Sequence, residues 1–289
     1  MRGPLQPRPR RVKRRPRLMR LGAAVALLAG LAGSASAAPS LLACPIGQLA
    51  QRVDGDAFTQ GLARWRLEAQ DPRAQVQAEG GVLDVQTPAG LSLWWRDELR
   101  GDFELRFTAT ALPAPATAGA VLGSPGTAGP LAGRISDLNL FWHATEADGR
   151  EPQPRDGAFA RYDTLRAYYA GIGANGNTTT RLRHYDGSGT RTLLQGWADG
   201  SEATPQDRHG PMTPATRLVA GQAVLLRLLS RTPTAADPVH GRLFLGAQEL
   251  FQLAQDVPKP HLQRGWFAFR TTASRWQLRD FEIWRCGPP

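Results

Sequence analysis

Polar side chains that could act on a sugar acid recur in two short segments of the sequence. The first segment carries Asn139 and His143, and the second carries Tyr169 and Arg181. A lyase acting on a uronic acid needs a group that neutralises the carboxylate, a base for the proton at C5 and an acid for the departing oxygen. Asn139 and Arg181 suit the first role, and His143 and Tyr169 suit the proton transfers. These four residues form the predicted catalytic set.

Side chains near this set are predicted to bind the substrate: Asp137, Arg183, Tyr185, Trp95 and Asn177. Aromatic rings stack on the apolar face of a pyranose, while amide, carboxylate and guanidinium groups bind its hydroxyl and carboxylate groups. A second interpretation stays open, because polar rows on strands are also the ordinary solvated face of a sheet. Asp after Ser136 is moreover a common turn-stabilising pair.

Hydrolase chemistry is a further alternative. A retaining glycosidase needs two carboxylates about 5 Å apart, and Glu146, Asp148 and Glu151 have the spacing seen in laminarinase-like jelly rolls. Gly149 within this run predicts a turn instead. No phosphate-binding loop, Cys/His zinc spacing or Gly-x-Ser-x-Gly elbow is present, so no cofactor is predicted, although calcium could bridge loops of such a fold.

The elements that must position these residues are strands. After the N-terminal region, short stretches of alternating polarity are separated by Gly, Pro and Asp turns, which is typical of an all-β fold. Eleven strands are predicted, at residues 75–78, 82–86, 91–96, 103–110, 135–143, 165–170, 178–185, 223–230, 242–245, 266–271 and 276–284. This number favours a two-sheet antiparallel jelly-roll β-sandwich.

Alternation along the strands predicts two polar rows. One face of the first segment should carry Asp137, Asn139, Phe141 and His143, and one face of the second should carry Thr179, Arg181, Arg183 and Tyr185. If the strands at 165–169 and 178–185 pair across the turn at 171–177, the two rows lie side by side. Adjacent tryptophans must face opposite ways, so one of Trp94 and Trp95 packs in the core and the other is free to stack on a sugar.

The N-terminal region reads as an export signal. Residues 1–37 contain eight arginines, Lys13 and no acidic residue, then an apolar stretch and the small residues Ala35-Ser36-Ala37. The remaining chain has 26 basic and 25 acidic side chains, which does not support nucleic acid as a partner. The apolar stretch is too short for a stable membrane span in the mature chain. A periplasmic or secreted protein is expected, with residues 38–289 as a single domain and long loops near 111–133 and 196–214.

Only two cysteines occur, Cys44 and Cys286, at the two ends of the predicted mature chain. In an oxidising compartment this arrangement favours a disulfide between the first and last strands. The sequence before Cys44 also resembles a lipobox, so a lipid anchor through Cys44 is the alternative.

Four segments together carry a family resemblance: WRLE at 65–68, SDLNLFWHA at 136–144, YYAGIGANGNTTTR at 168–181 and GWFAFRTT at 265–272. They resemble YesU-like proteins of the concanavalin A-like lectin/glucanase superfamily. The resemblance implies a jelly roll with a concave sheet that receives glycan, and a role in bacterial use of pectic polysaccharide, especially rhamnogalacturonan.

The expected function is therefore that of an exported protein that binds or degrades acidic plant-type polysaccharide or its oligosaccharides. Lyase chemistry is the enzymatic form that the residues favour, and a non-catalytic lectin-like module and a glycoside hydrolase are the alternatives.

Overall fold

The computed structural model describes residue 3 and residues 38–114, 133–254 and 261–289. The predicted signal peptide and most of the loop expected at 111–133 lie outside the described residues. Residues Ser40–Pro289 form one compact unit, distinct from Met1–Pro39.

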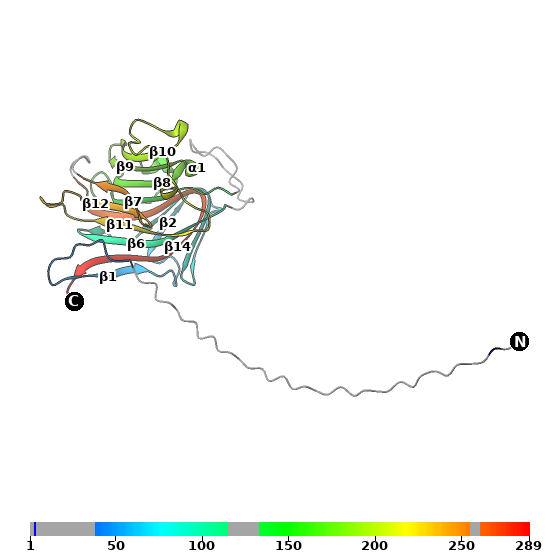
Figure 1. The fold of residues 1–289 in the computed structure, drawn as a ribbon, viewed down its shortest axis with the longest axis horizontal. Coiled ribbons are helices and arrows are strands. Elements are labelled where there is room, and N and C mark those ends of the chain that lie inside the picture. The colour runs from blue at the N-terminus through cyan, green and yellow to red at the C-terminus, as the bar shows by residue number, and fades with distance from the viewer. Residues whose placement is uncertain (1–2, 4–37, 115–132, 255–260) are drawn as a thin grey trace. The chain divides into compact units, whose positions relative to one another are not determined.

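The described residues of this unit form fourteen antiparallel strands (Figure 1). They are β1 Leu49–Asp56, β2 Trp65–Ala69, β3 Gln75–Glu79, β4 Val82–Trp95, β5 Leu99–Arg100, β6 Phe103–Leu112, β7 Leu138–Thr145, β8 Arg166–Gly173, β9 Thr179–Asp186, β10 Arg191–Ala198, β11 Ala223–Ser230, β12 Gly241–Leu245, β13 Gln248–Leu253 and β14 Arg264–Gly287. The helical elements are short: η1 Phe159–Tyr162, α1 Ala174–Asn177, η2 Gly200–Glu202 and η3 Pro214–Thr216.

The strands make two packed layers that share two long strands. The first layer, here the β7 sheet, runs β10-β9-β8-β7 and continues through the first half of β14, the second half of β4 and β2. The second layer, the β6 sheet, runs β13-β12-β11-β6 and continues through the second half of β14, with β1, β3 and the first half of β4 beside it. The ladder is unbroken because β4 and β14 pass through both layers. The expected two-sheet antiparallel sandwich is confirmed.

The long strand β14 bends where it passes from one layer to the other. Ala273 has a φ of 48°, and the pairing with β4 shifts between Thr272 and Ser274. The sequences predicted as separate strands at 266–271 and 276–284 are therefore the two halves of one bent strand. Bulges of this kind increase local twist, which lets one strand serve two stacked sheets.

The main hydrophobic core lies between the two layers. Alternation sends Leu138, Leu140 and Trp142 of β7 into it, and it continues through Tyr168 of β8 and Phe269 of β14. A smaller apolar cluster lies on the opposite side of the β7 sheet. That side, turned away from the main core, is called the outer face below.

Several strands escaped prediction because their sequences are not alternating apolar runs. β1 and β10 carry mostly polar or half-exposed side chains, and β1 is held mainly by its pairing with β14. Tertiary pairing decides such edge strands more than local propensity does.

The first and last strands of the compact unit meet at this pairing. Cys44 and Cys286 form a disulfide, with their Cα atoms 5.4 Å apart. The expected disulfide is confirmed, and it occupies the Cys44 sulfur that a lipid anchor would need.

Candidate functional site

The register of the β7 sheet aligns the predicted polar rows across the outer face. Asn139 of β7 lies opposite Gly171 of β8, which lies opposite Arg181 of β9. In the next row Tyr169 lies between Phe141 and Arg183. The expected pairing of 165–169 with 178–185 is confirmed, and β8 lies between the two polar rows on the same sheet.

The turn between β8 and β9 has the backbone that its sequence predicts. Asn175, Gly176 and Asn177 have φ values of 53°, 71° and 70°. Glycine and asparagine tolerate this left-handed region better than other residues do. The tight turn brings β9 back beside β8 with Arg183 opposite Tyr169.

A long connection between β7 and β8 covers part of the outer face. This segment, residues 146–165, is called the strap below. Its Tyr162 packs against Trp94 and Phe141, with ring centroids 6.2 and 5.5 Å away, and all three rings are buried. An aromatic row that would otherwise line an open trough is therefore covered along this half of the sheet.

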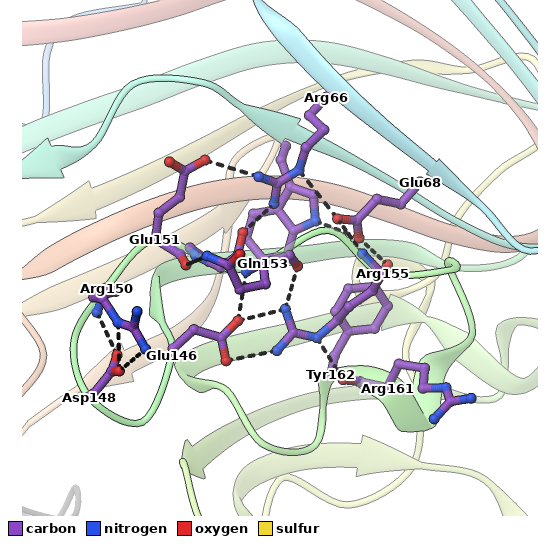
Figure 2. A network of polar contacts seen from close by, with 12 residues as sticks. Arg66, Glu68, Glu146, Asp148, Arg150, Glu151, Gln153, Arg155, Arg161 and Tyr162 are labelled. Atoms are coloured by element: carbon purple, nitrogen blue, oxygen red, sulfur yellow. Dashed lines mark hydrogen bonds and ion pairs between the residues drawn. The ribbon is translucent and has the colours of Figure 1, made fainter.

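Polar contacts hold the strap against β2 (Figure 2). The buried Glu68 carboxylate accepts hydrogen bonds from Tyr162 Oη at 2.7 Å, Trp94 Nε1 at 3.0 Å and the Arg155 backbone at 3.1 Å. Arg155 also pairs with Glu146 at 2.8 Å. Hydrogen bonds to a buried carboxylate are strong, so the strap is firmly fastened.

Two glycines let the strap backbone lie directly on the sheet. A Cβ on Gly90 would lie 2.3 Å from the Gly157 carbonyl oxygen, and a Cβ on Gly157 would lie 2.6 Å from the Gln70 nitrogen. Neither position has room for a side chain. The strap therefore rests on β2 and β4 as backbone against backbone.

Beyond the strap the outer face opens into a small cavity of about 110 Å³. Its lining combines three guanidinium groups with a phenol, a phenyl ring and several short polar side chains. The lining residues are Arg134, Asp137, Phe159, Tyr169, Ala174, Asn175, Thr179, Arg183, Arg270 and Thr272. This cavity is the candidate functional site.

Two of its guanidinium groups have no carboxylate partner in the part of the chain that the structure describes. Arg270 is 2% exposed, and its Nη1 donates to Thr272 Oγ1 at 2.8 Å while its Nε has no partner. Arg183 forms no side-chain hydrogen bond or ion pair within the described residues, and burial lowers the pKa of its guanidinium. Arginine nevertheless keeps its charge in proteins. Buried cations that lack an anion are costly, so this arrangement is suited to an anion from outside.

An unsatisfied amide lies beside the lining residue Asp137. Asn139 is 1% exposed, its Nδ2 donates to Asp137 Oδ1 at 3.3 Å, and its Oδ1 has no partner. The absent side chain of Gly171 leaves room above β8, since a Cβ there would lie 3.3 Å from Asn139 Oδ1 and 3.5 Å from Tyr169 Oη. Amide and phenol therefore share one opening.

Tyr169 is a neutral group at this site. Burial raises the pKa of its phenol above the ordinary value, and Arg270 opposes that shift without cancelling it. A phenol with a raised pKa keeps its proton at neutral pH, so it is available to donate a hydrogen bond. Tyr169 is therefore suited to donate to a ligand oxygen.

Asp137 has structural partners within the chain. Its carboxylate binds Arg134 Nη2 at 2.8 Å and Ser136 Oγ at 2.5 Å, and its own φ is 66°. These contacts agree with the alternative prediction that Asp137 stabilises a turn. Asp137 also lines the cavity. The anchored Asp137 neutralises Arg134 and leaves Arg183 and Arg270 as the unpaired charges.

The expectation that His143 shares the face of Asn139 is wrong. A bulge in β7 gives His143 a φ of 51° and shifts the pairing with β8 after Trp142. The ring points away from the outer face, where its Nε2 lies 2.8 Å from Ser230 Oγ and its centroid lies 5.6 Å from that of Phe103. Burial lowers the pKa of His143 to about 3, and His240 adds to the shift. The predicted base is thus separated from the cavity by the sheet, and its catalytic role stays a prediction.

Arg181 keeps the predicted face but is already paired. It binds Asp207 through two hydrogen bonds, of 2.8 Å from Nε and 2.7 Å from Nη2. Burial alone would raise the pKa of Asp207, but hydrogen bonds from Arg181 and Thr204 outweigh it and lower the pKa to about 2. Arg181 therefore fastens the loop after β10, within the insertion expected near 196–214.

Three predicted binding residues lie outside the cavity. Trp95 is fully buried in the main core, whereas Trp94 is the tryptophan on the outer face. Tyr185 is fully buried beside Phe141, 5.6 Å between centroids. Asn177 binds the backbone of Leu218 at 2.8 and 3.0 Å and so supports a neighbouring loop.

The carboxylates of the hydrolase alternative also have structural partners. Glu146 binds Arg155, Asp148 binds Arg150 and Glu151 binds Arg66 within the strap network (Figure 2). The turn predicted at Gly149 is present, since its nitrogen donates to the Glu146 carbonyl oxygen at 2.9 Å.

Arg270 was not among the predicted site residues. Alternation in β14 places it on the outer face with Ala268, because Phe267 and Phe269 pack in the main core. The sequence did offer one signal for Arg270, which is a charged residue within an apolar run. Its place at the site became clear only from the structure, where β14 lies beside β7 and Arg270 lies opposite Asn139.

Among the described residues, no cluster of three or more His, Cys, Asp or Glu side chains is placed to hold a metal ion. No helix in the described ranges is long and apolar enough to span a membrane.

Comparisons with known proteins give one family match and one solved structure that supports the fold. A family model described as Domain of unknown function (DUF6250) matches residues 85–281. No curated protein sequence matches the chain. A Bacillus subtilis protein of unknown function with a galectin-like fold is 14% identical, with a TM-score of 0.57, over 83% of this chain and all of that one.

Two further solved structures are similar at lower scores. The carbohydrate binding module CBM66 from Bacillus subtilis is 8% identical, with a TM-score of 0.43, over 76% of this chain and 94% of that one. LamAcat from Zobellia galactanivorans is 11% identical, with a TM-score of 0.46, over 81% of this chain and 98% of that one. At these identities the likeness concerns the fold alone.

Proposed function

We propose, for a chain that belongs to the DUF6250 family of domains of unknown function, that it binds acidic polysaccharide of the pectic type outside the cytoplasm. The cavity on the outer face of the β7 sheet is the proposed binding site. Lectin-like and glycan-active proteins use sandwiches of similar fold, but the proposal stands on the cavity itself.

The observation that carries the proposal is the pair of unpaired guanidinium groups. Arg183 and Arg270 line one cavity, and neither meets a carboxylate from the described residues. A uronate carboxylate supplies the missing charge, and guanidinium groups bind carboxylates through directed, charge-assisted hydrogen bonds. A neutral sugar would leave both cations uncompensated.

Other groups in the lining and next to it suit the rest of a sugar residue. Asn139 Oδ1 is free to accept a hydrogen bond from a hydroxyl group, and the Tyr169 phenol is suited to donate one. Phe159 offers a ring on the strap side of the cavity. One anionic group, several hydroxyl groups and a small apolar face are the features of a uronic acid.

Binding is favoured over cleavage because neither group predicted for proton transfer is placed to act as a base. His143 lies across the sheet, and the raised pKa of Tyr169 opposes its use as a base at neutral pH. Lyase chemistry would require one of these groups to accept the C5 proton. Cleavage is therefore the second outcome to be tested and not part of the proposal.

An extracytoplasmic location fits two features of the chain. The Cys44–Cys286 disulfide is stable in an oxidising compartment. The arginine-rich region and apolar stretch within residues 1–37 have the composition of an export signal.

The test compares ligands that differ only in charge. Binding of de-esterified polygalacturonate should be at least about tenfold tighter than binding of the fully methyl-esterified chain or of neutral glucans. Calorimetry measures the affinities, while ultraviolet absorbance and reducing ends report unsaturated and hydrolysed products. Equal affinity for the acidic and esterified chains would overturn the proposal. Product formation would replace binding by catalysis as the function.

A further inference from the structure

The outer face is not an open trough along its whole length. The strap covers the part that contains Trp94, Phe141 and Tyr185, and these side chains have almost no exposed surface. Glu68 and Arg155 fasten this cover to β2 (Figure 2). A polysaccharide chain therefore has no path across this half of the sheet.

The cavity ends against the strap. Phe159 forms the wall on this side, with its ring centroid 5.5 Å from that of Tyr169 and 4.6 Å from the Arg270 guanidinium carbon. Arg270 Nη2 also lies 3.4 Å from the Gly157 carbonyl oxygen. The unpaired arginine thus sits at the closed end, held between the sheet and the strap.

A second boundary is formed by the turn between β8 and β9. Ala174 and Asn175 line the cavity there, and Asn175 Nδ2 donates to Glu202 Oε2 at 2.9 Å. Next to this turn, Asp207 holds Arg181 beneath the loop that follows β10. Arg183 therefore lies between fixed walls and not on an extended cationic surface.

The size of the hollow agrees with a short ligand. At about 110 Å³ the hollow is small. Sites for drug-sized ligands measure about 300–1,000 Å³. The cavity therefore accommodates one carboxylate-bearing sugar residue in part or in whole, and not several residues in a row.

We infer that the cavity recognises the terminal sugar-acid residue of an acidic glycan chain and not an internal stretch of it. This inference rests on the proposed function. The terminal carboxylate lies between Arg183 and Arg270 at the closed end, and the remaining chain leaves on the side away from the strap. Recognition is then set by one residue, whatever the length of the chain behind it.

Chain length is the variable that tests this inference. Galacturonate monomer, trimer and hexamer should bind within about threefold of one another on a molar basis. Polygalacturonate should bind in proportion to its number of ends, so partial acid hydrolysis at constant mass should raise the binding capacity as ends are created. Affinity that rises with each added residue, or capacity that follows mass, would overturn the inference.

Two modified ligands show which end of the chain supplies the terminal acid. Borohydride reduction alters the reducing end, and lyase-generated oligomers carry an altered non-reducing end. Loss of binding on one of these changes, but not on the other, identifies the end that enters the cavity. Binding of the monomer without any binding of oligomers would contradict the inference, because the ligand would then be a free sugar acid.

A wall variant gives an independent test. Phe159→Ala should open the strap side and raise hexamer affinity relative to monomer affinity, whereas Arg161→Ala, at an exposed position of η1, should leave this ratio unchanged. The same length dependence in Phe159→Ala and in the unmodified protein would count against a wall at this position. Failure of all acidic ligands to bind would instead refute the proposed function, whereas tight binding that grows with length would refute only the terminal mode.

Discussion

The outer face of the β7 sheet has two halves that treat arginine differently. Under the strap, Arg66 pairs with Glu68 and Glu151, and Arg155 pairs with Glu146. Around the cavity, Arg183 and Arg270 have no carboxylate partner in the described part of the chain. The two halves lie on neighbouring strands of one sheet and share its aromatic row.

This difference separates structural charges from available ones. Where each guanidinium group meets a carboxylate, the pairs fasten a loop and leave little for a ligand. Where cations exceed anions in a confined, partly dry hollow, the missing charge has to come from a partner or from solvent ions. A polar row predicted from the sequence contains both paired and unpaired arginines. Only the three-dimensional structure shows which arginines have a carboxylate partner.

The largest effect on stability is expected from removing Glu68, which holds the strap on the covered half. Glu68→Ala leaves Tyr162, Trp94 and the Arg155 backbone without their acceptor, and should lower the free energy of unfolding by about 3–5 kcal/mol. Urea unfolding measures the loss, and hydrogen exchange should increase within the strap. Glu151→Gln at the exposed rim is the matched control, with a change of at most about 1 kcal/mol. Similar losses of unfolding free energy in both variants would show that Glu68 contributes no more to the stability of the strap than Glu151 does.

The next effect belongs to the open half. Arg183→Gln removes a guanidinium that stabilises no internal carboxylate, so affinity for acidic oligomers should fall about 10- to 100-fold while stability is retained or increased. Calorimetry and urea unfolding measure the two properties on one sample. The control is Arg161→Gln, which removes a largely exposed arginine of the strap. This variant should bind acidic oligomers normally. An Arg183 variant that binds acid normally would remove the contrast between the halves.

His143 sharpens the comparison because imidazole, unlike guanidinium, can lose its charge when it is buried without an anion. Its folded-state pKa is about 3, below the value of about 6.5 expected in an unfolded chain. Between these values the unfolded state binds a proton that the folded state does not, so stability is present above pH 6.5 and is lost as the pH falls.

His143→Gln should therefore flatten the fall in stability between pH 6.5 and about 3, by up to about tenfold in the folding equilibrium per pH unit. Urea unfolding across this range measures the slope. Ser230→Ala keeps the imidazole while removing its Nε2 partner, and should keep the steep slope. Identical slopes for the His143 variant and the unmodified protein would refute a buried neutral imidazole.

The smallest effect is expected at Gly171, next to the lining residue Tyr169. The methyl group of Gly171→Ala would lie 3.2 Å from Tyr169 Cε1 and 3.3 Å from Asn139 Oδ1, which is tight but adjustable. Affinity for an acidic monomer should fall about two- to fivefold, with a loss of stability near 1 kcal/mol. A calorimetric affinity equal to that of the unmodified protein would place the ligand away from this opening.

Much of the framework was readable from local sequence. Alternation fixed the inward and outward sides of β7, β8 and β9, and Gly and Asn predicted the turn that joins β8 to β9. The positions of Cys44 and Cys286 predicted the closing disulfide. These features depend on a strand period of two residues and on backbone preferences, which neighbouring residues determine.

The composition of the site was decided only by the tertiary structure. A single bulge turned His143 to the other side of the sheet, and the strap buried Tyr185, neither of which alternation alone reveals. Arg181 pairs with Asp207, which lies 26 residues away in the sequence. Arg270 lines the cavity although it belongs to β14, far along the chain. Charge pairing depends on distances of a few ångströms between segments remote in sequence, so the residues available to a ligand emerge only after folding has assigned the others their partners.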